Sequence, residues 1–343
     1  MSAIKKQTET SIVNRIPNRR RLLGVAAAMA GAFVVQAAHA QNYPDRPIQL
    51  IVPYSAGGPT DVAARVMAQA LSQRLGQSIV VMSMPGAGGI IGTDFVNRAK
   101  PDGYTLLFAV NSMAIFPYTR SASNPLPFDP NGFAPIGSVA ESAHVIVANK
   151  NLGIRNIADL VGAAKNKPDG YSFGSAGIGG TTHLPIALFA HRAGIKLLHV
   201  PYKGAAPAMA DTMAGVVSIS GPGYTDAVKA AIENGTLVAL ATTSAKRLPF
   251  LPNVPTLAEQ GYPDMVFPIW YALFAPKGTP TNAVNRVNAA LKAMADDAAY
   301  QKLQNAQGNV VTYMQPQQVA DMLKTDIDKL GARLKSAGID LEE

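Results

Sequence analysis

The chain has 343 residues, 48% of them apolar, and a formal net charge of +8. It contains no cysteine, which excludes a disulfide framework, a cysteine nucleophile, a thiolate metal site and a lipid-modified cysteine. Residues 1–40 carry six of the 30 basic side chains and one of the 22 acidic ones, so the remainder has a net charge of only +3. No run of Lys and Arg interleaved with aromatic residues follows residue 40, and we therefore expect no nucleic acid partner.

The first 40 residues have the layout of an export signal. A basic stretch over residues 1–21 precedes an apolar run over residues 22–35, and Ala38-His39-Ala40 is a small-x-small cleavage pattern. The apolar run is shorter than the ~20 residues of a membrane-spanning helix, which argues against an N-terminal membrane anchor. Arg19-Arg20-Arg21 fits a twin-arginine signal, although an ordinary secretory signal is equally compatible. We expect the signal to be cleaved and the mature protein to be free in its compartment.

Short apolar runs alternate with helical patterns along the rest of the chain. In the helical segments, apolar residues recur every three or four positions, as at Val62, Val66 and Ala70, with Gly76 as a stop signal. We predict strands at residues 47–52, 78–82, 104–110, 145–148, 171–173, 197–200, 216–220 and 237–242. We predict helices at residues 60–75, 92–99, 157–166, 182–193, 206–214, 226–234, 282–295 and 316–337.

The order of these elements indicates an α/β fold. Strands and helices alternate, and the strands are almost wholly apolar, which is typical of parallel sheets covered by helices. About 300 residues remain after the signal, a length that fits two domains better than one. Residues 121–133, rich in Pro, Asn and Ser, are expected to form a surface excursion, and residues 249–261 a connection with a short helix. Trp270 lies in an apolar run and is expected in the core near a hinge.

Four junctions between a predicted strand and a predicted helix are rich in glycine and small residues, at 53–58, 85–89, 174–182 and 202–206. In parallel α/β sheets such loops lie at the carboxyl ends of the strands, where ligands bind. Glycine lets the backbone approach a ligand closely, and the following helix offers unpaired N–H groups and a positive dipole end. A tight turn explains the glycines of any one loop equally well. Four loops of one kind favour a cleft that holds an anion through backbone groups.

Other motifs give weaker indications. Residues 86–92 come close to a dinucleotide-binding glycine pattern, but no acidic residue for a ribose follows the next strand. Ser172 fits the G-x-S-x-G pattern of hydrolases, yet it begins a strand instead of ending one. The histidines after the signal are not spaced as metal ligands. His183 and Lys203 fit either a place in the cleft or a structural role, and Asp61 fits the cap of the first predicted helix.

Short motifs in a fixed order resemble the substrate-binding receptors of tripartite tricarboxylate transporters, also called the Bug family. They are Tyr43-Pro44-Asp45-Arg46-Pro47-Ile48, the first two glycine-rich junctions with Asp61 and Arg65, Pro101-Asp102-Gly103-Tyr104-Thr105-Leu106, the junction at 174–184, Val200-Pro201-Tyr202-Lys203-Gly204, Thr243-Ser244-Ala245-Lys246-Arg247 and Val254-Pro255-Thr256. The resemblance runs from Tyr43 nearly to the end of the chain.

The resemblance implies a type II periplasmic-binding-protein fold with two lobes, each a mainly parallel sheet flanked by helices, and a ligand cleft between the lobes. It implies that residues 41–141 and 265–343 form lobe 1 and residues 142–264 form lobe 2. It implies no catalysis, no cofactor and no metal. The expected function is that of a monomeric receptor in the periplasm, which captures a small organic carboxylate and presents it to the permease subunits of the transporter in the membrane.

The resemblance also implies that backbone amides from loops of both lobes hold the ligand. The candidate residues on lobe 1 are Tyr54, Ala56, Gly57, Gly58 and Asp61, with Pro85, Gly86, Ala87, Gly88 and Gly89 nearby, and those on lobe 2 are Ser175, Gly177, Thr181, Thr182, His183, Tyr202 and Lys203. Ser218 stands where the family usually has an acidic residue, which disfavours an amino acid as ligand. Tyr224 is a candidate for the far end of the cleft, where it would admit a bulkier or aromatic carboxylate.

Two alternative functions remain open. A secreted hydrolase would use Ser172 or Ser175 as its nucleophile, but the sequence places no His and Asp pair to serve it. A sensor component would bind the same ligand and signal, instead of feeding a transporter. The sequence does not separate sensing from uptake.

Overall fold

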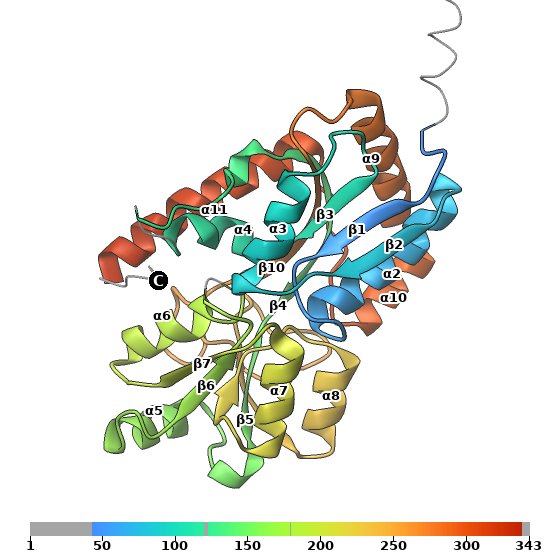
Figure 1. Cartoon of the computed structure of the whole chain (residues 1–343). Helices are drawn as coiled ribbons and strands as arrows, with labels where there is room; N and C mark the ends of the chain where they lie inside the picture. The colour runs from blue at the N-terminus through green and yellow to red at the C-terminus, as the bar shows by residue number, and fades with distance from the viewer. Residues whose placement is uncertain (1–42, 120–122, 179, 338–343) are drawn as a thin grey trace, which may run out of the picture. The chain divides into compact units, whose positions relative to one another are not determined.

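The structure is a computed structural model that describes residues 43–119, 123–178 and 180–337. The predicted export signal at residues 1–40 lies outside these residues. Two five-stranded sheets organise the chain (Figure 1). The first sheet has the order β2 (Ile79–Ser83), β1 (Ile48–Val52), β3 (Thr105–Ala109), β10 (Pro268–Ala275), β4 (Ala134–Ala143). The second has the order β7 (Leu198–Pro201), β6 (Ser172–Ser175), β8 (Ile219–Ser220), β5 (Val145–Asn149), β9 (Leu237–Thr242).

The two sheets have the same pattern of strand directions. In the first, β2, β1 and β3 are parallel, and β10 is antiparallel to both β3 and β4. In the second, β7, β6 and β8 are parallel, and β5 is antiparallel to both β8 and β9. One strand in each sheet therefore runs against the other four, and the predicted α/β fold with two mainly parallel sheets is confirmed. We call the parts built on the first and second sheets lobe 1 and lobe 2. The residue boundaries given above for the lobes stay a prediction.

Helices flank both sheets. With the first sheet lie α2 (Pro59–Leu75), α3 (Ile90–Asn97), α4 (Ser112–Ile115), α9 (Thr281–Ala295), α10 (Ala298–Ala306) and α11 (Pro316–Ala337). With the second lie α5 (Ile157–Asn166), α6 (Leu184–Ala193), α7 (Ala205–Ala214) and α8 (Asp226–Glu233). Short 3-10 turns occur at Ala87–Gly89, Phe116–Tyr118, Pro130–Gly132 and Lys150–Leu152. No helix in the described ranges has both the length and the apolar character to cross a membrane.

Local signals explain where the helices begin and end. The helix α2 has Pro59 in its first turn and ends at Gly76, which adopts φ +71° and donates its N–H to the Ser72 carbonyl. Asn156 accepts from the Asp159 N–H at the start of α5. Thr225 accepts from the Val228 N–H at the start of α8.

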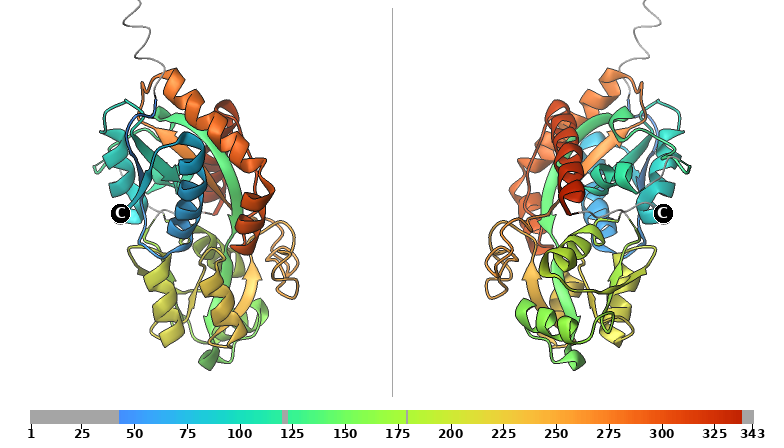
Figure 2. Two further views of the ribbon diagram at one scale, coloured as in Figure 1. Left: turned by 90° about the vertical axis from the view of Figure 1, so that its right-hand side faces the viewer. Right: turned by 90° about the vertical axis from the view of Figure 1, so that its left-hand side faces the viewer.

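The chain crosses between the sheets twice. His144 joins β4 directly to β5, so one extended stretch passes through both sheets in the side views (Figure 2). The return passes from β9 to β10 through residues 243–267. The two crossings are bonded to each other, because His144 N–H donates to Thr243 Oγ1 at 3.1 Å and Thr243 N–H donates to the His144 carbonyl at 3.0 Å. Thr243 Oγ1 also donates to the Phe267 carbonyl, and the Phe267 N–H donates to the Thr243 carbonyl, both at 2.9 Å. We expect the lobes to hinge at this ladder, and we call this side of the molecule the hinge side.

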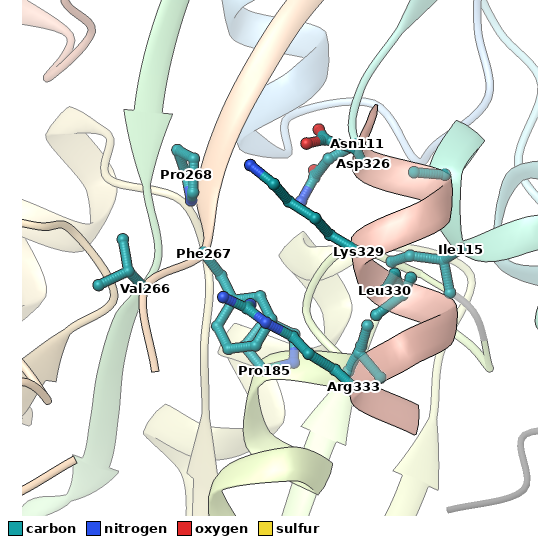
Figure 3. Close-up of a pocket in the computed structure, with 12 residues that line it drawn as sticks. Asn111, Ile115, Pro185, Val266, Phe267, Pro268, Asp326, Lys329, Leu330 and Arg333 are labelled. Atoms are coloured by element: carbon teal, nitrogen blue, oxygen red, sulfur yellow. The ribbon is translucent and has the colours of Figure 1, made fainter. Parts of the chain in front are cut away.

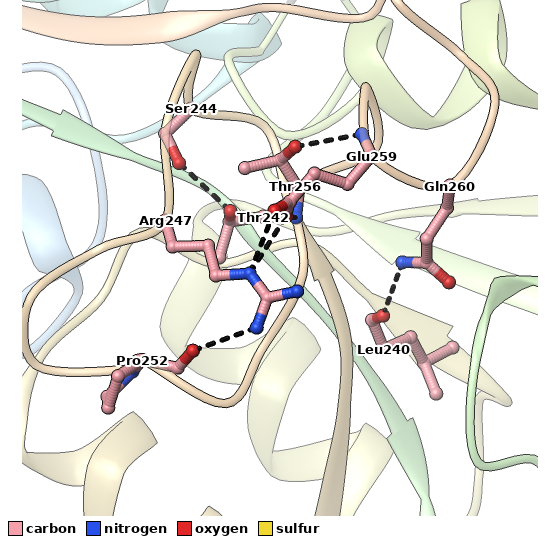
Figure 4. Close-up of polar contacts among 8 residues, drawn as sticks. All are labelled: Leu240, Thr242, Ser244, Arg247, Pro252, Thr256, Glu259 and Gln260. Atoms are coloured by element: carbon pink, nitrogen blue, oxygen red, sulfur yellow. Dashed lines mark hydrogen bonds and ion pairs between the residues drawn. The ribbon is translucent and has the colours of Figure 1, made fainter.

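The return crossing is held by Arg247 and Thr256, from the last motifs of the sequence resemblance, together with Glu259 (Figure 4). Arg247 Nε lies 2.9 and 3.0 Å from the two carboxylate oxygens of Glu259, and Arg247 Nη1 donates to the Pro252 carbonyl. Glu259 in turn accepts from the Thr256 N–H at 2.8 Å, while Thr256 Oγ1 accepts from the Glu259 N–H. These bonds fix the segment without a regular element, so the short helix predicted within residues 249–261 is wrong.

Other predictions about irregular regions also need correction. The strands β4 and β10 and the helices α4 and α10 were not predicted. The excursion at residues 121–133 is not wholly superficial, because Phe128 and Phe133 are buried and their rings, 5.8 Å apart, lie edge to face. Phe128 also contacts Phe116. Trp270 is 2% exposed in the same core, as predicted.

Candidate functional site

Four loops that each follow the carboxyl end of a strand and lead into a helix form the candidate site. Loop 1 (residues 53–58) joins β1 to α2, and loop 2 (84–89) joins β2 to α3. Loop 3 (176–183, of which the structure does not describe residue 179) joins β6 to α6, and loop 4 (202–204) joins β7 to α7. Four helices therefore begin at these loops, and the first turn of a helix has N–H groups without a partner inside the helix and a positive dipole end.

Loop 2 of lobe 1 touches loop 3 of lobe 2 through the backbone. A Cβ placed on Gly88 would overlap the carbonyl oxygen of Ile178, and one placed on Gly177 would lie 3.0 Å from Gly88 N. Loop 2 also has an unusual conformation, because four successive residues, 86–89, have positive φ. One of them is Ala87, with φ +45°. A positive φ is costly for alanine, and such strain is found mostly at functional sites.

Loop 1 of lobe 1 touches loop 4 of lobe 2 in the same manner. A Cβ on Gly204 would overlap the Ser55 side chain and approach Ser55 N. A Cβ on Gly58 would lie 3.8 Å from Ala206 N, at the start of α7. Each loop of one lobe thus has a partner loop on the other. Sequence reasoning did not single out Ser55 and Ile178, although both lie inside the glycine-rich junctions that it found.

Two hollows lie between the paired loops. The larger, of about 500 Å³, is lined by Ala87, Gly88, Gly177, Ile178, Pro201, Tyr202, Lys203 and Pro207. The smaller, of about 10 Å³, is lined by Tyr54, Gly58, Pro59, Thr60, Ala176, Thr181 and Ala205. Eight of the 18 predicted site residues therefore line these hollows: Tyr54, Gly58, Ala87, Gly88, Gly177, Thr181, Tyr202 and Lys203. Ala56 and Gly57 lie exposed at the tip of loop 1, and Pro85 and Gly86 are half-buried at the start of loop 2.

Several polar atoms near the loops are buried without a hydrogen-bond partner. They are the Tyr54 hydroxyl and Ser55 Oγ on loop 1 and His183 Nδ1 on loop 3. Tyr54 is 4% exposed, and burial raises the pKa of its hydroxyl well above the ordinary value, an effect that the nearby Ser112 partly offsets. An unpaired buried polar group costs free energy, so a ligand that hydrogen-bonds to these atoms would gain affinity.

The Asp61 carboxylate is bonded to the backbone of loop 1 and to two neighbouring side chains. It accepts from Gly57 N–H at 3.0 Å, from Ser83 Oγ at 2.9 Å and from two nitrogens of Arg65 at 2.8 and 3.0 Å. Burial raises the pKa of Asp61, but the bonds from Arg65, Gly57 and Ser83 outweigh it and hold the pKa below its ordinary value. The predicted capping role is wrong, because Gly58 is the N-cap of α2 and no side chain caps that helix.

Loop 3 is held by a cluster of polar and aromatic side chains. Ser175 Oγ accepts from Gly177 N–H at 3.1 Å and lies 2.7 Å from His199 Nε2, and Thr182 Oγ1 accepts from Ala176 N–H at 2.7 Å. The rings of His183 and His199 stack 4.2 Å apart. Burial lowers the pKa of His183 to about 3, with a contribution from His199, and burial lowers the pKa of His199 to about 4. Both rings are therefore neutral at pH 7.

The Ser175–His199 contact is half of a hydrolase arrangement, and the other half is missing among the described residues. Ser175 is completely buried, and no carboxylate bonds to His199. Ser172 Oγ is occupied by the Ser218 N–H at 3.1 Å, at the opposite end of β6 from loop 3. No group of acidic and histidine side chains in the described ranges is placed to hold a metal ion.

Loop 4 presents one anchored and one solvated side chain. The Tyr202 hydroxyl donates to Asp211 at 2.6 Å, and burial together with this bond raises the pKa of Tyr202 to about 12. Lys203 is exposed at the edge of the larger hollow. It is the cationic side chain among the residues that line the two hollows.

Tyr224 and Ser218, the two residues predicted near the far end of the ligand, both make contacts within lobe 2. Tyr224 is 2% exposed, and its ring packs 4.3 Å from that of Phe250 in a core cluster of lobe 2. Ser218 bonds to Ser172 near the start of β6, whereas loop 3 follows the end of that strand. The Tyr224 ring is thus packed in the core of lobe 2, and its place at the far end of the ligand stays a prediction.

Sequence comparisons identify relatives over nearly the whole chain. A sequence model of the tripartite tricarboxylate transporter family receptor (TctC) matches residues 63–339. A protein from the tcbD-tcbE intergenic region of Pseudomonas sp. strain P51 is 37% identical over 322 residues, which cover 92% of this chain and 93% of the relative. The protein BugT of Bordetella pertussis is 35% identical over 327 residues, which cover 95% of this chain and 100% of BugT.

Solved structures with the same fold extend the comparison. The periplasmic binding protein BugD has a TM-score of 0.82 at 34% identity, covering 88% of this chain and 100% of BugD. A Rhodopseudomonas palustris protein solved with adipate has a TM-score of 0.82 at 30% identity, covering 88% of this chain and 100% of that one. Another, solved with bound malate, has a TM-score of 0.79 at 27% identity, covering 85% and 100%. The two-lobed fold of periplasmic binding proteins is thereby confirmed.

Proposed function

This chain belongs to the family of tripartite tricarboxylate transporter receptors, and on that basis we propose that it binds a small organic carboxylate between its lobes and delivers it to a permease. Two structural neighbours were solved with the dicarboxylates malate and adipate. The observation that carries the proposal for this chain is the pairing of loops 1 and 4 and of loops 2 and 3 across the lobes.

The paired loops suit a carboxylate because backbone N–H groups can donate hydrogen bonds to its oxygens, so few charged side chains are needed. Helices α2, α3, α6 and α7 begin at these loops, so N–H groups and positive dipole ends converge on one region. Tyr54 and Ser55 add unpaired hydroxyls. In this proposal the ligand contacts Tyr54, Gly58 and the loop 2 backbone on lobe 1, and Ser175, Gly177, Thr181, Thr182, His183, Tyr202 and Lys203 on lobe 2. Asp61 acts indirectly, by fixing loop 1.

Export and partners complete the proposal. Receptors of this family are periplasmic, and a cleaved signal over residues 1–40 would send this chain there as a body with a net charge of only +3. A near-neutral body must bind an anion by local geometry more than by its overall field. We infer that the mature protein is monomeric, uses no cofactor and catalyses no reaction, and that its partner is the membrane permease of the transporter.

A ligand screen on purified protein lacking residues 1–40 tests the proposal. The protein is unfolded and refolded to remove retained ligand, and its melting temperature is measured with mono-, di- and tricarboxylates and with their uncharged amides. A ligand that binds only the folded state raises the free energy of unfolding, by about 2.7 kcal/mol when its concentration is a hundred times its Kd. The melting temperature rises accordingly. At least one carboxylate should do this where its amide does not. A refolded protein that responds to no carboxylate would count against the proposal.

A further inference from the structure

A separate cavity of about 230 Å³ lies on the hinge side of the molecule (Figure 3). Its walls come from α4 and α11 of lobe 1, from the first residues of α6 of lobe 2, and from the end of the return crossing at Phe267. It shares no lining residue with the two hollows between the loops. We call it the hinge cavity.

Two cationic side chains enter the hinge cavity from one face of α11. Lys329 and Arg333 are four residues apart, which places them on the same side of the helix, and Figure 3 shows both directed toward Phe267 and Pro268. The Arg333 guanidinium lies 5.0 Å from the centre of the Phe267 ring. Within the described ranges, neither cation belongs to an ion pair.

The one acidic group in the lining is already engaged. Asp326 Oδ2 accepts from the Trp270 indole N–H at 2.9 Å. Burial raises the pKa of Asp326 above its ordinary value, and the Trp270 bond and the charges of Lys329 and Arg333 offset this only in part. The cavity lining therefore has two cationic side chains and one carboxylate, which is already bonded to Trp270, so positive charge is in excess. The N-terminus of α6, at Leu184, adds the positive end of a helix dipole.

The rest of the lining is apolar, with one exception. Ile115, Leu184, Phe267 and Leu330 are each less than 9% exposed. Asn111 Oδ1 is buried without a hydrogen-bond partner, on the side of the cavity near Asp326. A concave, mostly apolar site with a few convergent polar groups is the usual form of a small-molecule site. Such a site favours a ligand that has a negatively charged group beside the two cations and an apolar part against the rest of the wall.

We propose that the hinge cavity is a second ligand site, which binds an organic monoanion with a compact apolar body and holds its carboxylate between Lys329 and Arg333. This goes beyond the proposed function, since the site does not involve the four loops. An occupant touches both lobes and the return crossing at once. It therefore stabilises the arrangement in which α6 lies against α11, and so acts on the opening of the hinge.

The chain contains its own reporter for this site. Trp270 is the only tryptophan, and it bonds to Asp326 in the cavity lining. Refolded protein lacking residues 1–40 is titrated with benzoate while tryptophan fluorescence is recorded, and with benzamide as an uncharged molecule of the same shape. We expect a saturable change with benzoate and binding at least about tenfold weaker with benzamide, as the loss of a charge-assisted hydrogen bond predicts. Equal binding of the two probes would overturn the proposal.

Charge variants locate the binding. The double variant Lys329→Gln/Arg333→Gln should weaken benzoate at least about tenfold, whereas Lys329→Arg, which keeps the charge, should retain it. Circular dichroism confirms that each variant is folded, and if the double variant is not, Lys329→Gln alone replaces it, because Lys329 is exposed. Unchanged benzoate affinity in the folded charge-removing variant would overturn the proposal.

Competition separates this site from the loops. If the carboxylate screen finds a ligand, benzoate is titrated again with that ligand saturating, and the tryptophan response should persist. Competitive loss of the benzoate response would mean one shared site and would overturn the proposal. If the screen finds no ligand, the benzoate titration and the charge variants still test the hinge cavity. The proposal for the loops and the proposal for the hinge cavity can therefore fail independently.

Discussion

The backbone of Gly88 on lobe 1 lies against the carbonyl oxygen of Ile178 on lobe 2, with no room for a Cβ between them. Gly88 has φ +62°, so its conformation and its surroundings both require glycine. The contact joins loop 2 to loop 3 directly beside the larger hollow. Closure of the two lobes therefore depends on a backbone-to-backbone approach that any side chain at position 88 would prevent.

Gly88→Ala should weaken ligand binding by holding loops 2 and 3 apart. We expect an affinity loss of about ten- to a hundredfold, since overpacking of this kind costs roughly 1–3 kcal/mol, measured by calorimetric titration with the ligand from the screen. Gly153→Ala is the matched control. Gly153 has a similar φ of +70°, but no atom lies within 4 Å of the position that a Cβ would take, so alanine there bears the same backbone strain without the contact. Equal affinity losses in both variants would contradict the role of the contact.

Tyr54→Phe should lower ligand affinity with little loss of stability. The hydroxyl is buried beside the smaller hollow without a partner, so its removal costs the folded protein little. If it donates to the bound carboxylate, the variant should bind about tenfold more weakly, as for the loss of one bond to a charged group. Tyr271→Phe, at an equally buried tyrosine in the core of lobe 1, is the control. Wild-type affinity in Tyr54→Phe would remove this residue from the site.

Asp61→Asn should destabilise the protein and disorder loop 1 together. The carboxylate is 2% exposed and accepts bonds from Gly57, Ser83 and Arg65, so the amide cannot satisfy all three donors. We expect a loss of about 1–3 kcal/mol in urea unfolding and weaker ligand binding. Arg65→Gln should cost less, because the Arg65 side chain is 53% exposed. A larger loss in Arg65→Gln than in Asp61→Asn would refute this ranking.

Regular elements with a clear period were predictable from the sequence, and the loops between them were too. Residues 157–166 have strong helical spacing, and the structure has α5 at Ile157–Asn166. By contrast, β4 contains Gly137, Ser138 and Ser142 and shows no strand pattern. Its buried serines are satisfied by distant partners: Ser138 donates to the Tyr271 carbonyl and Ser142 to the Gly308 carbonyl, both at 3.1 Å. Only the tertiary fold supplies those acceptors.

The candidate site shows the same division. Glycine-rich junctions after apolar strands indicated the four loops, because that pattern is local. Which loop faces which was not predictable, since Gly88 and Ile178 meet only after both lobes have folded. The packing of Tyr224 was not predictable for a similar reason. This residue is flanked by small residues, as in a binding loop, but Phe250 from the return crossing covers its ring. The hinge cavity likewise joins Leu184 to Arg333, from opposite lobes.

Three histidines, of which His144 and His183 are buried and His199 is half-buried, should make the protein less stable in acid. Burial lowers the pKa of His144 and His199 to about 4 and of His183 to about 3, against an ordinary value of about 6.5. Between these values the unfolded chain binds protons that the folded chain does not. The contribution of these histidines to the free energy of unfolding is therefore complete above about pH 6.5, and it is lost as the pH falls toward 4.

Urea unfolding over a pH series checks this dependence. His183→Gln should flatten the slope of stability against pH in this window, because one titrating group is removed. Phe173→Leu is the control, since Phe173 belongs to the same ring stack but does not titrate. It should lower stability by a similar amount at every pH and keep the slope. An unchanged slope in His183→Gln would show that this histidine does not contribute.

Ser175→Ala should separate a structural serine from a nucleophile. Ser175 Oγ accepts from the Gly177 N–H and contacts His199, so its loss leaves two buried groups unsatisfied and should cost about 1–3 kcal/mol in urea unfolding. Because loop 3 depends on these bonds, carboxylate affinity should fall as well. A hydrolase would instead lose turnover of an ester substrate. The wild-type protein should turn over no such ester, since no carboxylate orients His199 among the described residues. Ester hydrolysis that disappears in Ser175→Ala would establish the enzyme in place of the receptor.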